Sequence, residues 1–311
     1  MNARETLRVN ERGHLEIGGA DCTELAERFG TPLYVFDEAH IRKMMRIYRG
    51  TIEREYEGNG KVLYASKAFS CEAIYRIADS EKIGIDVVSG GELYTALKAG
   101  FPASEIYMHG NNKLGYELKE ALDAGIGCIV ADAYSEIDTI EREAEKRGLY
   151  RISFCASIPV WKRIRAYIQT RKRTIPFSVA DGTAEKITVT RFQKHVNLRG
   201  FHCHIGSQIF EKQSFVLAAE KCMDFAAEMK EKLGFVTEEL NMGGGFGIWY
   251  TDEDKKISPE GYGEYLEALI SAVKARALEK GLKLPYLLTS RVVPSSAKRV
   301  SRSTVGAVKG P

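Results

Sequence analysis

Residues 61–100 read KVLYASKAFSCEAIYRIADSEKIGIDVVSGGELYTALKAG, and in this stretch a short apolar run is twice followed by a segment with helical spacing. The runs KVLYAS and IGIDVVS hardly alternate between apolar and polar residues, which is typical of parallel strands that are buried on both faces. The segments after them place apolar residues at i, i+3 and i+4, as amphipathic helices do. Strand and helix therefore alternate, which indicates an α/β fold.

Six further strand-like runs bring the number to eight. They are EIYMHG (105–110), GCIVAD (127–132), YRISFCA (150–156), RGFHCHIGS (199–207), EELNMGGG (238–245) and PYLLT (285–289). Eight parallel strands covered by helices favour a closed (β/α)8 TIM barrel over an open, doubly wound sheet. We expect the barrel to occupy residues 37–289. Since no helical pattern follows the eighth run, we expect that strand to lack a covering helix.

Composition and charge exclude several classes of protein. The 311 residues carry 45 Lys and Arg against 42 Asp and Glu, a balance that implies neither a nucleic-acid partner nor a membrane partner. The six cysteines are widely spread and form no C-x-x-C pair, so we expect buried, reduced thiols. The polar N-terminus and the lack of a long apolar run predict a cytoplasmic protein.

The candidate site residues follow the strands, because barrel enzymes place their active sites at the carboxyl ends of the strands. Lys67 follows the first strand, where loss of hydration makes an amine a usable nucleophile. Asp86 and Glu92 lie near the end of the second strand. Taken singly, the lysine is also compatible with a surface position, and each acid with a helix cap.

Histidines suggest a second chemistry. The run HCHIGSQ would place His202 and His204 on one face of the sixth strand, by the two-residue period of a strand. With His109 after the third strand they resemble a zinc-ligand set, so a metal-dependent barrel hydrolase is an alternative. Because such hydrolases usually need a carboxylate cluster as well, we assign no metal site.

The glycine-rich turn MGGGFG (242–247) follows the seventh strand, where barrel enzymes often bind phosphate. Glycines allow backbone N–H groups to approach a phosphate closely. A lysine for an aldehyde, a ring that can stack and backbone donors for a phosphate together describe a site for pyridoxal 5'-phosphate. This combination is more specific than any of its parts.

Five motifs carry a resemblance to a known family: YASKA, DVVSGGEL, HGNNK, GFHCHIGSQ and MGGGFGIWY. In order and rough spacing they resemble the fold-type III pyridoxal-phosphate decarboxylases, in particular the diaminopimelate decarboxylase family, over about residues 10–289. HGNNK favours diaminopimelate over the ornithine and arginine relatives. The resemblance implies a barrel of the alanine racemase/decarboxylase type, a β-domain built from both chain ends, a head-to-tail homodimer, and decarboxylation of meso-diaminopimelate to L-lysine.

The resemblance also implies roles for individual residues. Lys67 would bind the aldehyde of the cofactor and His204 would stack on its ring. Asp86 and Glu92 would line the site near the lysine. The phosphate would be held by a hydroxyl and by glycines, namely Ser207, Gly243, Gly244 and Gly245.

The chain departs from the family pattern in two places. The family follows the eighth strand with Glu-Pro-Gly-Arg, whose Glu contacts the pyridine nitrogen, whereas Ser290 and Arg291 begin the corresponding stretch here. Residues 157–178, SIPVWKRIRAYIQTRKRTIPFS, replace a segment with a Pro-Gly turn and a His-x-His. We assign residues 1–36 to the N-terminal strand segment of the β-domain and 290–311 to an aberrant tail, and we expect the C-terminal part of the β-domain to be missing.

A shift of the reading frame accounts for these departures. A family-like EPGRSIVGEAGVTLY read one base out of frame yields SRVVPSSAKRVSRST, and VGAVKG then returns in frame. We therefore hypothesise frame-shifted patches at about 157–176 and 290–304. From the missing glutamate and β-domain we expect weak cofactor binding at Lys67 and negligible turnover. Two alternatives are a non-catalytic barrel that binds pyridoxal phosphate and a decarboxylase of the ornithine or arginine type.

Overall fold

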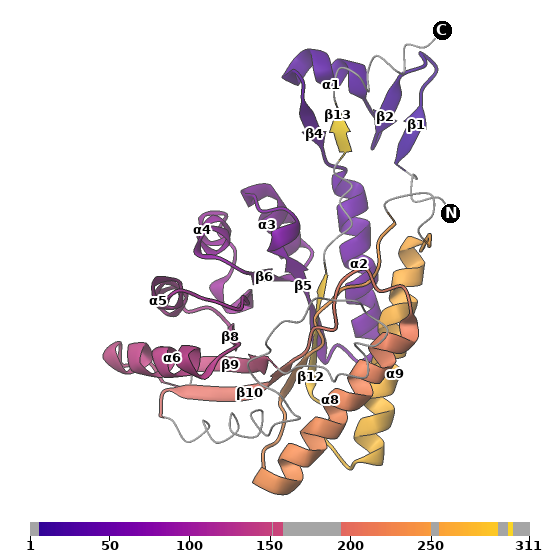
Figure 1. Cartoon of the computed structure of the whole chain (residues 1–311). Coiled ribbons are helices and arrows are strands. Elements are labelled where there is room, and N and C mark those ends of the chain that lie inside the picture. Colours follow the sequence, from indigo (N-terminus) through magenta and orange to yellow (C-terminus); the bar gives the residue numbers. More distant parts are fainter. Residues whose placement is uncertain (1–5, 151, 158–193, 250–254, 292–297, 301–311) are drawn as a thin grey trace.

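The structure is a computed structural model that describes residues 6–150, 152–157, 194–249, 255–291 and 298–300 (Figure 1). Most of the two predicted frame-shifted patches lies outside these residues. The three segments that we predicted, 1–36, 37–289 and 290–311, stay predictions.

Eight parallel strands close into a barrel, and each of the eight predicted runs contributes one of them (Figure 1). In chain order they are β5 (Gly60–Ala65), β6 (Gly84–Val87), β7 (Ile106–Met108), β8 (Cys128–Ala131), β9 (Ile152–Ser157), β10 (Val196–His202), β11 (Glu239–Asn241) and β12 (Tyr286–Arg291). The first and last strands close the barrel, with Thr289 of β12 opposite Val62 of β5. The predicted (β/α)8 barrel is therefore confirmed.

Helices between the strands cover the outside of the barrel (Figure 1). They are α3 (Glu72–Ser80), α4 (Gly90–Lys98), α5 (Gly115–Ala124), α6 (Tyr134–Lys146), α8 (Lys212–Leu233) and α9 (Pro259–Glu279). Local sequence sets their ends: Ser89 caps α4 with its hydroxyl, while Gly125 and Gly234 end α5 and α8 in the left-handed region that glycine tolerates best. Two 3-10 turns, η1 (Ser66–Ala68) and η2 (Ala103–Glu105), complete the barrel.

Helix α2 (Glu38–Glu55) corrects the expectation that the eighth strand is left uncovered. It lies beside α9 and packs against β5, with Met44, Tyr48 and Ile52 almost fully buried (Figure 1). Leu287 and Leu288 of the eighth strand are completely buried. The expectation was wrong because it sought the covering helix after the last strand, whereas a helix that precedes the first strand lies beside the closing pair β12–β5.

A smaller unit stands apart from the barrel, at the top of Figure 1. It contains the antiparallel sheet β1 (Leu7–Val9), β2 (Leu15–Ile17) and β3 (Ala20–Asp21), and helix α1 (Cys22–Phe29), which Asp21 caps. Strand β4 (Leu33–Val35) pairs antiparallel with β13 (Lys298–Val300). Segments from near both ends of the chain thus meet in one sheet outside the barrel.

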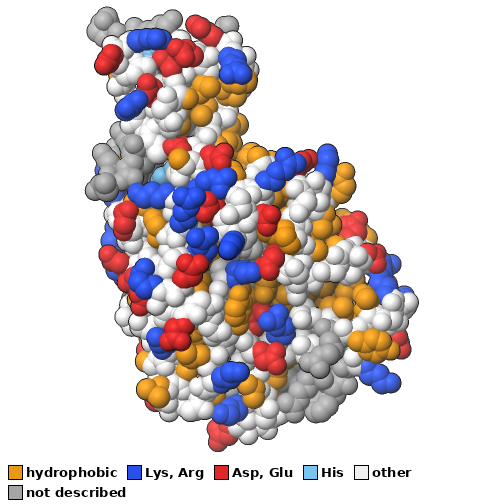
Figure 2. Space-filling view, turned by 180° about the vertical axis from the view of Figure 1, so that it is seen from behind, with side chains coloured by type: hydrophobic (Ala, Val, Ile, Leu, Met, Phe, Trp, Pro, Cys, Tyr) orange, Lys and Arg blue, Asp and Glu red, His pale blue; other side chains and the backbone are white. Residues whose placement is uncertain are grey.

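The surface carries both signs of charge. Figure 2 shows Lys and Arg beside Asp and Glu over the face it displays, with no broad basic area there. Glu81, for example, accepts hydrogen bonds from Arg42 and Arg46 of α2. None of the helices among the described residues is both long and apolar enough to cross a membrane. Five cysteines are buried and Cys71 is half-buried, and all six are free thiols, as expected.

Candidate functional site

Lys67 lies at the carboxyl end of the barrel, in the 3-10 turn that follows β5. Hydrogen bonds fix this turn: the Tyr64 hydroxyl donates to the carbonyl of Phe69 at 2.8 Å, and Ser70 and Tyr75 share a hydrogen bond of 2.8 Å. The Lys67 side chain is exposed. The described residues therefore do not provide the loss of hydration that we expected around this amine, although they hold it at the predicted end of the barrel.

Asp86 and Glu92 lie on the next unit and differ in their surroundings. The Glu92 carboxylate accepts the backbone N–H of Val88 at 2.8 Å, and the Glu92 N–H donates to Ser89 Oγ at 3.2 Å, so Glu92 helps to cap α4. Burial raises the pKa of Glu92, and the nearby charge of Lys67 opposes that shift. Asp86 is buried in β6, and its Oδ2 lies 3.8 Å from His109 Nε2.

His109 and His202 form a buried pair below this surface. Their rings meet edge to face with centroids 4.6 Å apart. Burial, aided by the other imidazole and by Lys113, holds the pKa of His109 well below its usual range. Burial likewise lowers the pKa of His202 to about 3. Both imidazoles are therefore neutral at pH 7.

His202 and His204 point to the same place, as predicted, since a Cβ atom on Gly243 would lie 3.4 Å from His202 Cε1 and 3.0 Å from His204 Nδ1. Strand β10 ends at His202, and the chain then leaves the sheet through Gly206 and Gln208, which both have positive φ. His202 is consequently buried, whereas His204 is exposed at the barrel end. Partial loss of hydration lowers the pKa of His204 to about 4, and the positive charge of Lys67 lowers it further. Lys67 and His204 are therefore neighbours, and His204 is neutral at pH 7.

The loop of residues 243–245 packs closely against the loop that contains His204. Gly243 and Gly245 have φ of +60° and +99°. A Cβ atom on Gly245 would lie 1.9 Å from the carbonyl oxygen of Gly206, and one on Gly243 would lie 2.7 Å from that of Cys203. Only glycine fits at these two positions.

The donors of this loop suit an anion. In the described part of the chain, the N–H groups of Gly244 and Gly245 enter no hydrogen bond, although Gly244 is buried. Since buried N–H groups are rarely left unpaired, these two donors call for an acceptor. The exposed Ser207 lies on the adjoining loop. These groups fit a phosphate such as that of pyridoxal phosphate.

Gly243 differs from its neighbours, and two residues that the sequence analysis missed explain why. Its N–H donates to Asn241 Oδ1 at 2.9 Å, and its carbonyl accepts from Thr289 Oγ1 at 2.9 Å. Both side chains are completely buried. Gly243 therefore has no free N–H for a phosphate. The one signal in the sequence was position, because Asn241 and Thr289 lie at or near the ends of the seventh and eighth strands.

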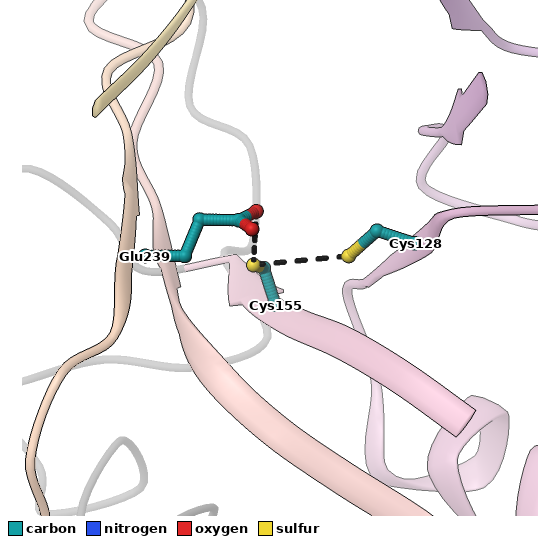
Figure 3. Close-up of side chains that lie close together, drawn as sticks. All are labelled: Cys128, Cys155 and Glu239. Atoms are coloured by element: carbon teal, nitrogen blue, oxygen red, sulfur yellow. Dashed lines mark hydrogen bonds between the residues drawn. The ribbon is translucent and has the colours of Figure 1, made fainter. Parts of the chain in front are cut away.

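A second polar cluster lies inside the barrel and includes Cys128, Cys155 and Glu239 (Figure 3). Cys128 donates to Cys155 at 3.8 Å, and Cys155 donates to Glu239 at 3.1 Å. Glu239 also accepts a hydrogen bond from the Tyr107 hydroxyl at 3.2 Å and forms an ion pair with Arg199 at 3.0 Å. We call these five residues the interior cluster. Glu239 and Cys128 begin their strands, so the cluster lies toward the barrel end opposite Lys67.

Within the interior cluster, Cys128, Cys155 and Glu239 form the one group among the described residues whose ligand atoms are close enough together for a metal ion. The hydrogen bond with Cys128, together with burial, raises the pKa of the Cys155 thiol, and burial raises the pKa of Glu239. Protonated thiols are poor metal ligands. The set His109, His202 and His204, which we considered for zinc, does not form such a group within the described residues.

Known proteins are similar to this chain in both fold and sequence. The family described as "Pyridoxal-dependent decarboxylase, pyridoxal binding domain" matches residues 38–285. The diaminopimelate decarboxylases of Bacillus methanolicus and Bacillus subtilis are 44% and 43% identical to the chain, over 91% of its length in each case. The chain spans only 65% and 64% of those two relatives.

A solved structure gives the same result. The diaminopimelate decarboxylase of M. jannaschii, crystallised with L-lysine, has a TM-score of 0.84 and 32% identity, and the match covers 94% of this chain and 67% of that one. Fold, motifs and family match agree, and the chain belongs to the pyridoxal-dependent decarboxylases.

Proposed function

We propose that the chain binds pyridoxal 5'-phosphate at the carboxyl end of its barrel and serves the decarboxylation of meso-diaminopimelate to L-lysine and carbon dioxide. One observation carries the proposal. An exposed amine, a neutral imidazole and two unpaired backbone donors, from the ends of three different strands, face the same end of the barrel.

Each group has a separate task. Lys67 supplies the amine for the aldehyde of the cofactor, and the neutral ring of His204 stacks on the cofactor ring. The N–H groups of Gly244 and Gly245 and the hydroxyl of Ser207 hold the phosphate, while Gly243 shapes the loop. When bound, the cofactor accepts the electron pair that remains after carbon dioxide leaves.

The acids of the second unit stand beside this arrangement. Glu92 holds the start of α4 next to Lys67. Asp86 is buried, and its carboxylate lies next to the histidine pair, 3.8 Å from His109 Nε2. Both therefore act on the site through its shape and its local charge.

The proposed substrate and the proposed homodimer rest on the similarity to the relatives. Two relatives above 40% identity are diaminopimelate decarboxylases, and a structural neighbour with that name was solved with L-lysine. The HGNNK motif, which ends in the buried Lys113, supports the same substrate. We propose in addition a homodimer located in the cytoplasm, which light scattering of the purified chain and fractionation of cells would test.

Turnover by the chain as it stands is proposed to be negligible. Ser290 stands where the family pattern has the glutamate that contacts the pyridine nitrogen. Without that carboxylate the ring is a weaker electron acceptor. A barrel that binds the cofactor without turnover is the second candidate, and the Ser290 position favours it.

The test measures L-lysine formed from meso-diaminopimelate with added pyridoxal phosphate, with L-ornithine and L-arginine as comparison substrates. The chain is compared with a variant that restores Glu-Pro-Gly-Arg at 290–293 (Ser290→Glu, Arg291→Pro, Val292→Gly, Val293→Arg). We expect negligible formation of lysine by the chain and measurable formation by the restored variant, with diaminopimelate preferred. Preference for ornithine or arginine would overturn the substrate. Cofactor binding without turnover in both proteins would establish the second candidate.

A further inference from the structure

We propose that Asn241 and Thr289 are positioning residues that fix the anion-binding conformation of the loop 243–245, and that Asn241 joins this loop to the buried His109. The inference rests on the proposed binding of a phosphate at this loop. It concerns two residues that touch neither cofactor nor substrate in the proposed site.

The geometry starts from the Gly243 peptide unit. Asn241 ends β11 and accepts the Gly243 N–H at 2.9 Å, and Thr289 on the neighbouring β12 donates to the Gly243 carbonyl at 2.9 Å. Both polar groups of this residue are thus held by side chains from two adjacent strands. Since Asn241 and Thr289 are 0% exposed, water does not compete for these hydrogen bonds.

This fixation has a consequence for the next two residues. With Gly243 held at φ +60° and Gly245 at φ +99°, the N–H groups of Gly244 and Gly245 are left without partners inside the described part of the chain. Successive N–H groups in such a turn form a concave site for an anion. Asn241 and Thr289 therefore act on the anion through the shape of the loop.

The orientation of the Asn241 amide follows from its partner. A backbone N–H can only donate, so the atom that faces Gly243 must be the amide oxygen. The amide nitrogen of Asn241 therefore faces His109 Nε2, at 3.5 Å. An amide nitrogen can only donate, and His109 Nε2 must then be the acceptor, with its proton on Nδ1.

His109 carries the connection farther. Its ring meets His202 edge to face, and Asp86 Oδ2 lies 3.8 Å from its Nε2, beyond hydrogen-bond distance. One buried row of polar groups thus runs from Asp86 on β6 through His109 and Asn241 to the N–H of Gly243. The neutral state of His109 agrees with its lowered pKa.

The experiment compares two ligands, pyridoxal 5'-phosphate and pyridoxal, which differ only in the phosphate. Their dissociation constants are measured by absorbance for the wild type, Asn241→Leu, Thr289→Val and Thr289→Ser. We expect the two apolar variants to lose about tenfold of the preference for the phosphorylated ligand, because a loosened loop presents its donors poorly. Thr289→Ser keeps the hydroxyl and should retain most of the preference. The affinity for pyridoxal should differ little between the wild type and the three variants.

A second readout separates positioning from general stability. Nitrogen-15 NMR of the imidazoles should show His109 protonated on Nδ1 in the wild type, and a mixture of tautomers in Asn241→Leu. Circular dichroism checks that each variant is folded. If Asn241→Leu does not fold, Thr289→Val and Thr289→Ser decide the result.

Two failures can be told apart. A wild type that binds both ligands equally would overturn the proposed phosphate site itself. A wild type that prefers the phosphorylated ligand, together with variants that keep the whole preference, would overturn the role of Asn241 and Thr289 and leave the proposed function standing.

Discussion

The barrel contains two buried polar clusters that differ in whether their hydrogen-bonding groups have partners. In the interior cluster, one carboxylate oxygen of Glu239 accepts a hydrogen bond from Cys155 (Figure 3). The other accepts one from Tyr107 and forms an ion pair with Arg199. At the other end of the barrel, His202 Nδ1 is buried without a hydrogen-bond partner, and the N–H groups of Gly244 and Gly245 also lack one among the described residues.

The difference shows which buried polar groups indicate function. A buried group costs free energy unless it is hydrogen-bonded, so a fully paired cluster can be explained by stability alone. Unpaired groups that lie next to an exposed lysine call for a ligand to complete them. Burial of a charged residue in a barrel is therefore weak evidence of a site, whereas unsatisfied donors at the carboxyl end are strong evidence.

The largest expected effect is that of Lys67→Ala. We expect it to abolish the yellow absorbance band that pyridoxal phosphate shows when it is joined to a lysine, because the barrel end then lacks its exposed amine. Lys61→Ala is the matched control, since Lys61 lies on β5, the strand that precedes Lys67, and forms an ion pair with Glu105. An unchanged band in Lys67→Ala would place the cofactor elsewhere.

Glu239→Ala tests the other side of the comparison. Removing one partner from a buried ion pair typically costs about 3 kcal/mol in the free energy of unfolding, and here Tyr107 and Cys155 lose their acceptor as well. The control Glu279→Ala breaks an exposed pair with Arg276 and should cost no more than about 1 kcal/mol. Urea unfolding measures both. The preference of Glu239→Ala for pyridoxal phosphate over pyridoxal should stay unchanged, and a change would show that the two clusters are coupled.

Gly245→Ala should weaken binding of pyridoxal phosphate about tenfold, because a side chain at φ +99° costs about 1–2 kcal/mol and its Cβ meets the Gly206 carbonyl. Gly91→Ala is the control. The nearest atom to its added Cβ is Ser89 Oγ, at 3.9 Å, and its φ is not in the left-handed region. Equal binding by the two variants would count against the loop as the phosphate site.

A further expected effect is on the pH dependence of stability. The pKa of His202 falls from 6.5 to about 3 on folding, so between these values the unfolded chain binds a proton that the folded chain does not. Stability from His202 is therefore present above pH 6.5 and is lost as the pH falls toward 3. Urea unfolding between pH 7 and pH 4.5 should show a shallower loss for His202→Gln than for the wild type. Equal slopes would mean that His202 is hydrated in the folded protein.

Sequence alone predicted the barrel well because its strands are continuous apolar runs that a surface strand would not tolerate. It did not predict that His202 is buried and His204 exposed, because β10 ends at His202 and the chain leaves the sheet there. The roles of Asn241 and Thr289 could not be predicted from the sequence, because they depend on hydrogen bonds to Gly243 that only the fold creates. The position of helix α2 beside the closing strands was not predicted, because closure of the barrel joins segments that are far apart in the chain.

The most direct test of the account is to find where the cofactor attaches. The purified chain is mixed with pyridoxal phosphate, reduced with borohydride so that the bond to the lysine becomes permanent, and digested for mass spectrometry. The account predicts the label on Lys67, well above that of a denatured control, and on neither Lys61 nor Lys113. A label on another lysine, or none above that of a denatured control, would contradict it.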